Sequence, residues 1–541
     1  MIQEENNHPN KPLADLIEHV SVVRHMGGNP VITGLAYDSR EVRPGGLFFA
    51  LKGVHTDGHT YIEQALENGA AAVIHQDPVI HQDPATPASQ TPQRTAFIQV
   101  ENSRTVMSPI AAAFYDHPSN NLTVIGVTGT DGKSTTVSFL HQLLNLAGYK
   151  AGFISTVQYD TGLGAVKNHY RQSTPEPSEI HKIVRQMVTN GCTYGVIEAT
   201  SHGLSPVNNR LGDISFHAGV ITNLSHEHLE FHKTFERYAD DKANLFRAVT
   251  GFGVVNRGDP HHTLFAGATA APVYSYAVIQ NQKGEGKSED MTQNPAPRKG
   301  AETPLLQADM TASRIHGYPG HQTFTLHYKG RSYPARLNMP GMFNIENILA
   351  ALLTLDKLEA EGLDTVSLLE YLPRLVPVKG RMNPIDQGQP FSVLVDYAHT
   401  PGSFQKLFPM LRPLVKGRLI ALFSSAGERD MEKREQLGAI ASEYSDIIVL
   451  ADEDPRGEPP MNILKDVARG CRNKTPGDTL FLIEDRREAI AAAFTMAEPD
   501  DLILLLGKGH ESTIIYAHGS IPWDESTVAA ELLNEMGYRK P

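Results

Sequence analysis

The sequence predicts an α/β fold made of parallel sheets and divided into three domains. Short apolar runs typical of strands alternate with helical patterns, and this alternation places helices on both faces of a parallel sheet. One apolar run leads into a glycine-containing loop, a lysine and three hydroxyl residues, the pattern of a phosphate-binding loop. The chain has 541 residues, too many for a single hydrophobic core.

The domain boundaries follow breaks in this pattern. We expect an N-terminal domain over residues 1–118, a central domain over 119–377 and a C-terminal domain over 378–541, the last one after a proline-bearing break. A segment near 75–95 repeats IHQDP, and a segment at 280–304 is polar and rich in Gly and Pro. We expect both to be insertions that form mobile surface loops.

The composition narrows the class of protein. Hydrophobic residues make up 40% of the chain and charged residues 20%, as in ordinary globular proteins. The formal net charge of −13 argues against a general nucleic-acid binder, although an anionic small substrate could still bind in a local basic cleft. There are two cysteines, no leader-like N-terminus and no apolar run of about 20 residues. We expect a cytoplasmic monomer that neither binds nucleic acid nor inserts into a membrane.

The phosphate-binding loop lies between an apolar strand at 122–129 and a helix that begins near Lys133. Backbone N–H groups of the loop and the helix N-terminus can bind one anion. Lys133 would reach the outer phosphates, and Ser134 or Thr135 would contact a magnesium ion. The strict pattern has a glycine where this chain has Val127. A simple strand-to-helix turn is the alternative, but it does not explain a lysine beside three hydroxyl groups.

Two further segments carry acidic and histidine side chains directly after strands. Glu198 ends the apolar run before EATSHGL, at the sheet edge where α/β enzymes present their chemistry. A second segment is rich in His and Glu and contains His226, Glu227, His228, Glu230 and His232. Alone, such a loop is more often solvated surface. Beside a phosphate-binding loop, both segments favour a magnesium site.

Together these motifs resemble the Mur ligase family. TGTDGKST, EATSHGL, TNLSHEHLEFH with YADDKANLF, GMFNIEN, KGRM and DYAHTP occur in the order typical of that family. AYDSREVRPGGLFFALKG near the N-terminus, with DPRGE and GKGHE near the C-terminus, is similar to one branch of it. That branch adds the third residue to UDP-N-acetylmuramoyl-L-Ala-D-Glu in peptidoglycan synthesis. The resemblance covers nearly the whole chain, excepting the two insertions and the extreme N-terminus.

The resemblance implies a fold and a reaction. The expected fold is the three-domain Mur ligase architecture, with a central P-loop-type parallel sheet and a Rossmann-like C-terminal domain. The expected cofactors are ATP and Mg²⁺. The D-Glu γ-carboxylate would attack the γ-phosphate of ATP, and the amine of a diamino acid would then attack the acyl phosphate and expel phosphate.

The resemblance also assigns residues to each step. Those expected to be catalytic are Lys133, Glu198, His228 and Lys242. The expected metal ligands are Ser134, Glu198, His228 and Lys242 as a carbamate. The expected ATP-binding residues are Gly129, Thr130, Asp131, Gly132, Lys133, Ser134, Thr135, Asn344, Asn347, Arg381 and Asp396. Those expected to bind the UDP-sugar and dipeptide are Ser39, Arg40, His55, Ser173, Thr174, Ser201 and Arg210. The expected amino-acid pocket contains Arg429, Asp454, Arg456, Gly507 and Glu511.

Two of these assignments have plain structural alternatives. Carbon dioxide would convert the Lys242 ammonium into a carboxylate-like magnesium ligand, but a lysine at this position could also be a surface helix residue paired with Asp or Glu. Asp38, Ser39 and Arg40 could form a turn with an aspartate cap rather than a nucleotide contact.

The identity of the incoming diamino acid stays open. Members that use meso-diaminopimelate carry Asp-Asn-Pro-Arg where this chain has Glu453-Asp454-Pro455-Arg456. Arg456 can bind a carboxylate bidentately in any case. Asp454 adds a negative charge, which favours a cationic side chain such as lysine or ornithine, whereas Arg456 and GKGHE are shared with the diaminopimelate enzymes.

Three other classes of protein remain as alternatives. Another amide ligase, such as folylpolyglutamate synthetase, would lack the N-terminal DSREVRPGGLFFALKG pattern. A P-loop ATPase switch would hydrolyse ATP without a carboxylate acceptor. A non-catalytic scaffold would have no reason to keep Lys133, Glu198, His228 and Lys242 together.

Overall fold

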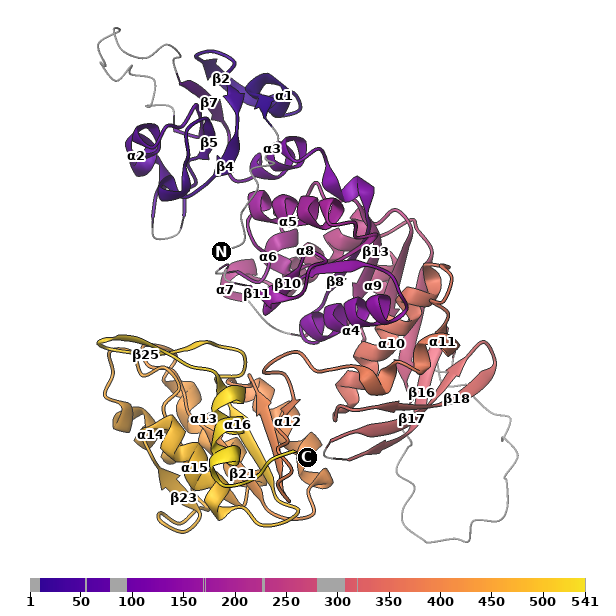
Figure 1. The fold of residues 1–541 in the computed structure, drawn as a ribbon, viewed down its shortest axis with the longest axis vertical. Helices are drawn as coiled ribbons and strands as arrows, with labels where there is room; N and C mark the ends of the chain where they lie inside the picture. The colour runs from indigo at the N-terminus through magenta and orange to yellow at the C-terminus, as the bar shows by residue number, and fades with distance from the viewer. Residues whose placement is uncertain are drawn as a thin grey trace. The chain divides into compact units, whose positions relative to one another are not determined.

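The computed structural model describes residues 10–53, 56–77, 95–168, 170, 172–225, 229–279, 307–318 and 320–540 (Figure 1). The chain forms two compact units, Met1–Tyr276 with Ala350–Asp364 and Ala277–Leu349 with Thr365–Pro541. Each unit contains both helices and strands. The two expected insertions fall almost entirely outside the described residues, so their mobility stays a prediction.

The first unit begins with a five-stranded sheet in the order β2-β7-β6-β5-β4. Its strands are β2 (Val22–Met26), β4 (Gly34–Ala36), β5 (Gly46–Phe49), β6 (Ala72–His75) and β7 (Ala96–Val100). Strands β4 to β7 are parallel, and β2 is antiparallel to β7. The helices of this region are α1 (Leu13–Ile17), α2 (Ile62–Glu67) and α3 (Met107–Phe114), and a short ladder joins β1 (Lys11–Pro12) to β3 (Val31–Ile32).

The same unit contains the predicted parallel sheet, in the order β9-β12-β8-β13-β14-β15. These strands are β8 (Thr123–Thr128), β9 (Ala151–Ile154), β12 (Tyr194–Glu198), β13 (Phe216–Ile221), β14 (Phe252–Asn256) and β15 (Val273–Val278). The short strands β10 (Gln158–Asp160) and β11 (Val166–Lys167) extend it antiparallel beside β9. The helices between the strands are α4 (Lys133–Leu146), α5 (Pro177–Thr189), α6 (Ser201–Leu204), α7 (Leu229–His232), α8 (Phe235–Ala248) and α9 (His262–Ala266).

Buried apolar side chains explain why this sheet forms. All five residues of β12 and of β14 are buried, as expected for parallel strands covered on both faces. Each buried Val, Leu, Ile or Phe contributes about 1.5–3 kcal/mol. The strand at 122–129 and the helix from Lys133 are confirmed as β8 and α4. The carboxyl ends of β8, β12 and β13 therefore meet at one edge, with the predicted phosphate-binding loop among them.

The second unit contains three antiparallel strands and a parallel six-stranded sheet. The antiparallel strands are β16 (Met310–Gly317), β17 (Gln322–Tyr328) and β18 (Arg331–Leu337). Helix α10 (Met342–Lys357) begins in this unit, which also contains α11 (Thr365–Leu369).

The six-stranded sheet has the order β19-β20-β24-β21-β22-β23, and all its pairs except β19–β20 are parallel. Its strands are β19 (Asn383–Pro384), β20 (Ser392–Asp396), β21 (Leu419–Phe423), β22 (Ile447–Leu450), β23 (Leu480–Leu482) and β24 (Leu502–Leu506). The helices are α12 (Pro401–Leu411), α13 (Glu432–Tyr444), α14 (Pro460–Ala468), α15 (Arg486–Met496) and α16 (Glu525–Glu535), and a hairpin joins β25 (Thr513–Tyr516) to β26 (Gly519–Pro522).

Two separate cores cover the faces of this sheet. One contains apolar residues of α12, α13 and α14, and the other contains those of α15 and α16. Side-chain caps fix where several of these helices start: Thr400 and Ser403 form a capping box at α12, and Asp485 and Asp524 cap α15 and α16.

Among the described residues, no helix is both long enough and apolar enough to cross a bilayer.

Candidate functional site

The phosphate-binding loop follows β8 and ends where α4 begins at Lys133. Gly129 has a φ of +141°, and a Cβ there would lie 1.9 Å from Thr222 Oγ1, so only glycine fits. The backbone N–H of Thr130 donates to the carbonyl oxygen of Asn223 (2.9 Å), after β13. These contacts fix the loop at the N-terminus of α4, where the helix dipole and exposed N–H groups favour an anion.

Two lysines converge on this loop. Lys133 Nζ donates to the carbonyl oxygens of Gly129 and Thr130 (3.1 and 2.8 Å), and Lys242 Nζ donates to the same Gly129 oxygen (2.6 Å). Lys242 extends from α8, is 2% exposed and lies 4.7 Å from the centre of the Tyr238 ring. The alternative of a surface helix lysine is therefore wrong.

Glu198 lies at the carboxyl end of β12 and is 2% exposed. Its carboxylate accepts hydrogen bonds from Ser134 Oγ (2.8 Å), from Thr156 N (2.9 Å) and from Thr156 Oγ1 (3.0 Å). Thr156 therefore orients Glu198, a role that the sequence did not reveal. Its only signal was a hydroxyl residue two positions after the apolar run that forms β9.

The chemistry of these groups fits a magnesium ion. Magnesium prefers oxygen ligands and is usually held by one or two carboxylates together with phosphates and water. Glu198 and Ser134 offer a carboxylate and a hydroxyl within hydrogen-bond distance of each other. Over the described part of the chain, no three His, Cys, Asp or Glu side chains form a metal-binding group. His228 lies outside that part, so its role stays a prediction.

Thr174, a residue predicted to contact the dipeptide, is connected to the same strand end. Thr174 Oγ1 donates to the carbonyl oxygen of Glu198 (3.1 Å) and is hydrogen-bonded to Thr200 Oγ1 (2.8 Å). Arg210 Nη1 donates to the carbonyl oxygen of Thr174 (3.1 Å), and its guanidinium also pairs with Glu176 (3.1 Å). Ser173 is half-buried beside them.

Ser201 belongs to a buried hydrogen-bonded chain. His232 is joined to Ser201 Oγ through Nε2 (3.0 Å) and to Asp241 through Nδ1 (2.8 Å). All three side chains are buried, so this chain connects α6, α7 and α8 internally. One member of the predicted His/Glu-rich loop is thus part of the framework around Ser201.

Residues 38–40 form an aspartate-capped turn, which was the structural alternative to a nucleotide contact. Asp38 accepts a hydrogen bond from Arg40 N (3.0 Å) and so caps a short 3₁₀ turn, Ser39–Glu41. Ser39 is buried and donates to Gln64 Oε1 (2.6 Å), while the Arg40 side chain is exposed and pairs with Asp38. His55 lies outside the described residues. Nucleotide binding by these residues stays a prediction.

A cavity of about 1210 Å³ lies beside this turn. It is lined by residues of the N-terminal sheet region and of the start of α5, among them Tyr37, Asp38, Arg40, Glu176, Glu179 and Lys182. Its size is sufficient for a nucleotide-sized ligand.

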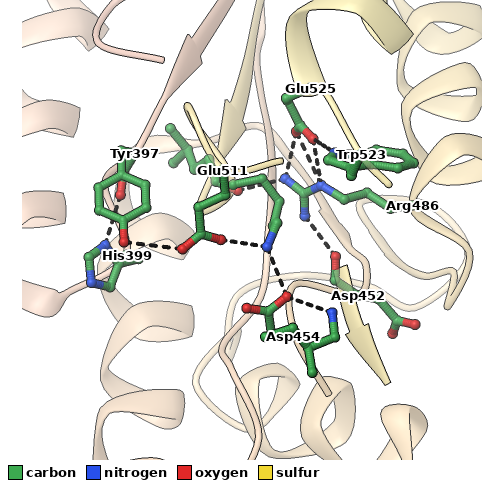
Figure 2. Close-up of polar contacts among 11 residues, drawn as sticks. Tyr397, His399, Asp452, Asp454, Arg486, Glu511, Trp523 and Glu525 are labelled. Atoms are coloured by element: carbon green, nitrogen blue, oxygen red, sulfur yellow. Dashed lines mark hydrogen bonds and ion pairs between the residues drawn. The ribbon is translucent and has the colours of Figure 1, made fainter. Parts of the chain in front are cut away.

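In the second unit, two loops at the carboxyl ends of β22 and β24 come together (Figure 2). We call the loops 453–456 and 507–511 the amino-acid pocket. Lys508 Nζ donates to Asp454 Oδ1 (2.8 Å) and to Glu511 Oε2 (2.5 Å), and its side chain is fully buried. Tyr397 OH donates to the other Glu511 oxygen (3.3 Å). Lys508 was missed in the sequence, although it stands inside the GKGHE motif.

These contacts affect the charge that Asp454 presents to a substrate. Asp454 Oδ1 also accepts a hydrogen bond from Ile515 N (2.9 Å), so the carboxylate is engaged on two sides. Lys508 is shared by Asp454 and Glu511, so its ammonium offsets only part of the negative charge that Asp454 adds to the pocket. A preference for lysine or ornithine over meso-diaminopimelate stays a prediction.

The other pocket residues differ in their surroundings. Gly507 has a φ of +98°, and a Cβ there would lie 2.8 Å from Glu453 Oε2. Burial raises the pKa of Glu453. Arg456 has a buried Nε that finds no hydrogen-bond partner within the described ranges. The side chain of Arg429 is exposed.

Arg381 and Asp396, which the resemblance places near the nucleotide, adjoin Tyr397. The Arg381 guanidinium lies over the Tyr397 ring, 5.0 Å from its centre. Asp396 accepts hydrogen bonds from Met382 N and Ala398 N (both 2.8 Å), and burial raises its pKa although Arg381 opposes the shift.

The remaining ATP-site predictions, Asn344 and Asn347, are buried near the start of α10. Gly132 is the residue before α4, Thr135 is in its first turn, and Asp131 N donates to Asn223 Oδ1 (3.0 Å).

Comparisons with known proteins match three consecutive segments. Residues 31–115 match the catalytic domain of the Mur ligase family, 127–355 match the Mur ligase middle domain, and 380–509 match the glutamate ligase domain of Mur ligases. The chain is 43% identical to the UDP-N-acetylmuramyl-tripeptide synthetase of Treponema denticola, over 97% of this chain and 98% of that relative. The chain belongs to the Mur ligase family.

Two other matches agree with this membership. The UDP-N-acetylmuramyl-tripeptide synthetase of Roseiflexus sp. is 42% identical, over 97% of this chain and 99% of its own. A solved UDP-N-acetylmuramoyl-L-alanyl-D-glutamate–2,6-diaminopimelate ligase has the same fold, with a TM-score of 0.64 at 24% identity, covering 98% and 99% of the two chains. The predicted Mur ligase architecture and the ligase class are confirmed. The exact domain boundaries stay a prediction.

Proposed function

We propose that this chain is an ATP-dependent ligase that joins a diamino acid to the D-Glu γ-carboxylate of UDP-N-acetylmuramoyl-L-Ala-D-Glu. Its product would be the UDP-linked tripeptide of peptidoglycan synthesis. The observation that carries the proposal is the convergence of Lys133, Ser134, Glu198 and Lys242 around the end of β8. Relatives of matching length that share the name UDP-N-acetylmuramyl-tripeptide synthetase support the substrate.

The loop residues would act on the phosphates of ATP. Backbone N–H groups at the start of α4 would bind anions, and Lys133 would exchange its two carbonyl partners for the outer phosphates. Ser134 and Glu198 would hold a magnesium ion, which supplies positive charge to the transferring phosphoryl group. Because phosphoryl transfer depends on positioning and electrostatics, Thr156 contributes by fixing the Glu198 carboxylate.

Lys242 is proposed to act as a carbamate. As an ammonium it shares the Gly129 carbonyl oxygen with Lys133, so two cationic groups lie on one acceptor. After the ammonium loses a proton, the neutral amine would add carbon dioxide and release a second proton, so that a carbamate anion replaces the cation and the like-charge contact with Lys133 becomes an attractive one. It would also provide another oxygen ligand of the kind that magnesium prefers.

The amino-acid pocket would bind the incoming diamino acid. The Arg456 guanidinium, whose buried Nε has no hydrogen-bond partner over the described ranges, suits a carboxylate. Glu511 is part-exposed and suits an ammonium group. These groups support a diamino acid in general and leave lysine, ornithine and meso-diaminopimelate as alternatives.

The decisive experiment measures phosphate release with ATP, magnesium and UDP-N-acetylmuramoyl-L-Ala-D-Glu. L-lysine, L-ornithine and meso-diaminopimelate are added one at a time, and the mass of the product is determined by mass spectrometry. We expect release to depend on one amino acid and to yield a tripeptide. Release that is indifferent to both the dipeptide and the amino acid would favour an ATP-driven switch instead.

A further inference from the structure

Arg486 lies at the first position of α15, outside every motif that the sequence singled out. Its side chain is fully buried, and its guanidinium has three partners (Figure 2). Nη1 donates to the carbonyl oxygen of Asp452 (2.9 Å), and Nη2 donates to that of Leu506 (2.7 Å). Nε and Nη2 also donate to the Glu525 carboxylate at 2.6–3.1 Å.

The two carbonyl groups belong to strands that are not neighbours. Asp452 follows β22 and Leu506 ends β24, and β21 lies between these strands in the sheet. The residues that come next along the chain are the two loops of the amino-acid pocket. Arg486 therefore fixes the distance between the points where these loops begin. The contact of Lys508 with Asp454 joins the two loops at a second point, further along each of them.

The geometry requires arginine. A guanidinium has five N–H donors in a rigid planar fork, whereas a lysine ammonium is a point charge on a flexible stem. A lysine at 486 could keep the ion pair with Glu525, but it could not hold both carbonyl groups in the same arrangement. This difference separates a role in spacing the loops from a role in balancing the Glu525 charge.

Glu525 and Trp523 complete what we call the Arg486 cluster. Glu525 is fully buried, and its carboxylate also accepts a hydrogen bond from Trp523 Nε1 (2.6 Å). Trp523 N donates to the carbonyl oxygen of Ser512 (2.8 Å), directly after the second pocket loop. The chain has one tryptophan, so its fluorescence reports on this cluster alone.

We propose that Arg486 is a positioning residue for the incoming amino acid. Its guanidinium is engaged by Glu525 and two backbone carbonyl groups, and it sets the distance between the loop that presents Arg456 and the loop that presents Glu511. This inference rests on the proposed function, because the two loops form a substrate pocket only if the chain is an amino-acid ligase. Loss of the spacing weakens amino-acid binding and leaves the binding of ATP and of the UDP-linked dipeptide unchanged.

The test is the variant Arg486→Lys in the full chain, with phosphate release measured against each of the three substrates. The KM for the amino acid is expected to rise at least tenfold, and the KM values for ATP and dipeptide to stay within twofold. Arg418→Lys is the matched control. Arg418 likewise binds a carboxylate, Asp501, and a carbonyl oxygen, that of Met496, and it also pairs with Glu498, but it lies at the amino end of the same sheet. Its amino-acid KM is expected to stay within twofold.

Trp523→Phe is the second variant, because it removes one hydrogen bond to Glu525 and keeps an aromatic side chain. It is expected to raise the amino-acid KM about threefold, and it decides the question if Arg486→Lys does not fold. In Arg486→Lys that folds, the tryptophan emission should respond less to the amino acid than in the unchanged protein.

If Arg486→Lys folds and its amino-acid KM is unchanged, the positioning role is overturned but the proposed function is not. If Arg486→Lys does not fold, an unchanged amino-acid KM in Trp523→Phe has the same meaning. An equal rise in all three KM values would also overturn the positioning role, because a merely structural role acts on every substrate. Phosphate release by the unchanged protein that ignores the amino acid would instead overturn the proposed function, and the positioning role with it.

Discussion

At the residue scale, Lys508 carries the charge balance of the amino-acid pocket. Its ammonium is shared by the carboxylates of Asp454 and Glu511, and its side chain is fully buried. Burying an ammonium without partners is costly, so each of these carboxylates stabilises the fold as well as shaping the pocket. The specificity of the pocket therefore depends on the set of three charges and not on Asp454 alone.

Asp454→Asn tests this charge balance. The substitution makes the pocket more positive by one unit, which favours a diamino acid with a second carboxylate. A unit charge contributes about 1–2 kcal/mol at about 10 Å and an effective dielectric constant of about 20. We therefore expect the ratio of kcat/KM for meso-diaminopimelate to that for L-lysine to rise about tenfold. Asp446→Asn is the control, because Asp446 lies just before the same strand, β22, and accepts a hydrogen bond from Leu419 N. An unchanged ratio in Asp454→Asn would show that the pocket does not sense this charge.

Lys133→Met tests the phosphate-binding loop. Removing a single group that stabilises charge at the reacting centre typically lowers kcat about 10²–10³-fold. We expect a loss of this size in amino-acid-dependent phosphate release. The melting temperature should change little, because the partners of Lys133 Nζ among the described residues are two carbonyl oxygens of its own loop. Lys150→Met, which removes a lysine bound to the Asn190 carbonyl oxygen, is the matched control and should keep full activity. Activity within tenfold of the unchanged protein in Lys133→Met would contradict the assignment.

At the element scale, α5 is sensitive to pH through His181. This histidine is fully buried, and burial lowers its pKa to about 3. In the unfolded chain a histidine has a pKa of about 6.5. Below that value the unfolded state takes up a proton that the folded state refuses. The free energy of unfolding therefore falls as the pH decreases from about 6.5 towards 3.

The pH effect of His181 can be measured with His181→Leu. From a shift of this size, the histidine should cost about 2 kcal/mol of stability at a pH of about 5 and nothing at a pH of about 7.5. Thermal unfolding at both pH values should show a smaller decrease in melting temperature for His181→Leu than for the unchanged chain. Equal pH dependence in the two proteins would mean that His181 does not govern this sensitivity.

Local patterns explain which elements the sequence could predict. The run at 122–129 and the helix after Lys133 follow from neighbouring residues, and the structure contains both. Because the carboxyl ends of parallel strands meet at one edge of a sheet, the sequence also predicted that Glu198 lies near the loop, and the structure places it there. The sequence did not reveal Thr156, Lys508 or the pairing of Arg486 with Glu525. Glu525 is 39 residues from Arg486, and no periodicity connects residues that only the sheet order brings together.

At the scale of the whole molecule, the family places three domain types in order along the chain, whereas the contacts of the structure define two compact units. The second unit includes 277–349, which precede the predicted boundary at 377. The two descriptions differ because a compact unit is defined by packing alone, whereas a domain has its own core and could fold by itself.

The fragment 378–541 provides the last test. It contains the whole six-stranded sheet and both of its cores, which cover the two faces with α12 to α14 and with α15 and α16. A sheet buried on both faces has what independent folding requires, so we expect the fragment to melt cooperatively when followed by circular dichroism. Each 1 kcal/mol of packing lost from residues before 378 should lower the melting temperature by about 2–4 °C in a domain of this size. A longer fragment, 307–541, is the control. If only the longer fragment melts cooperatively, the boundary lies upstream of 378 and the antiparallel strands β16 to β18 belong to the folding unit of the C-terminal sheet.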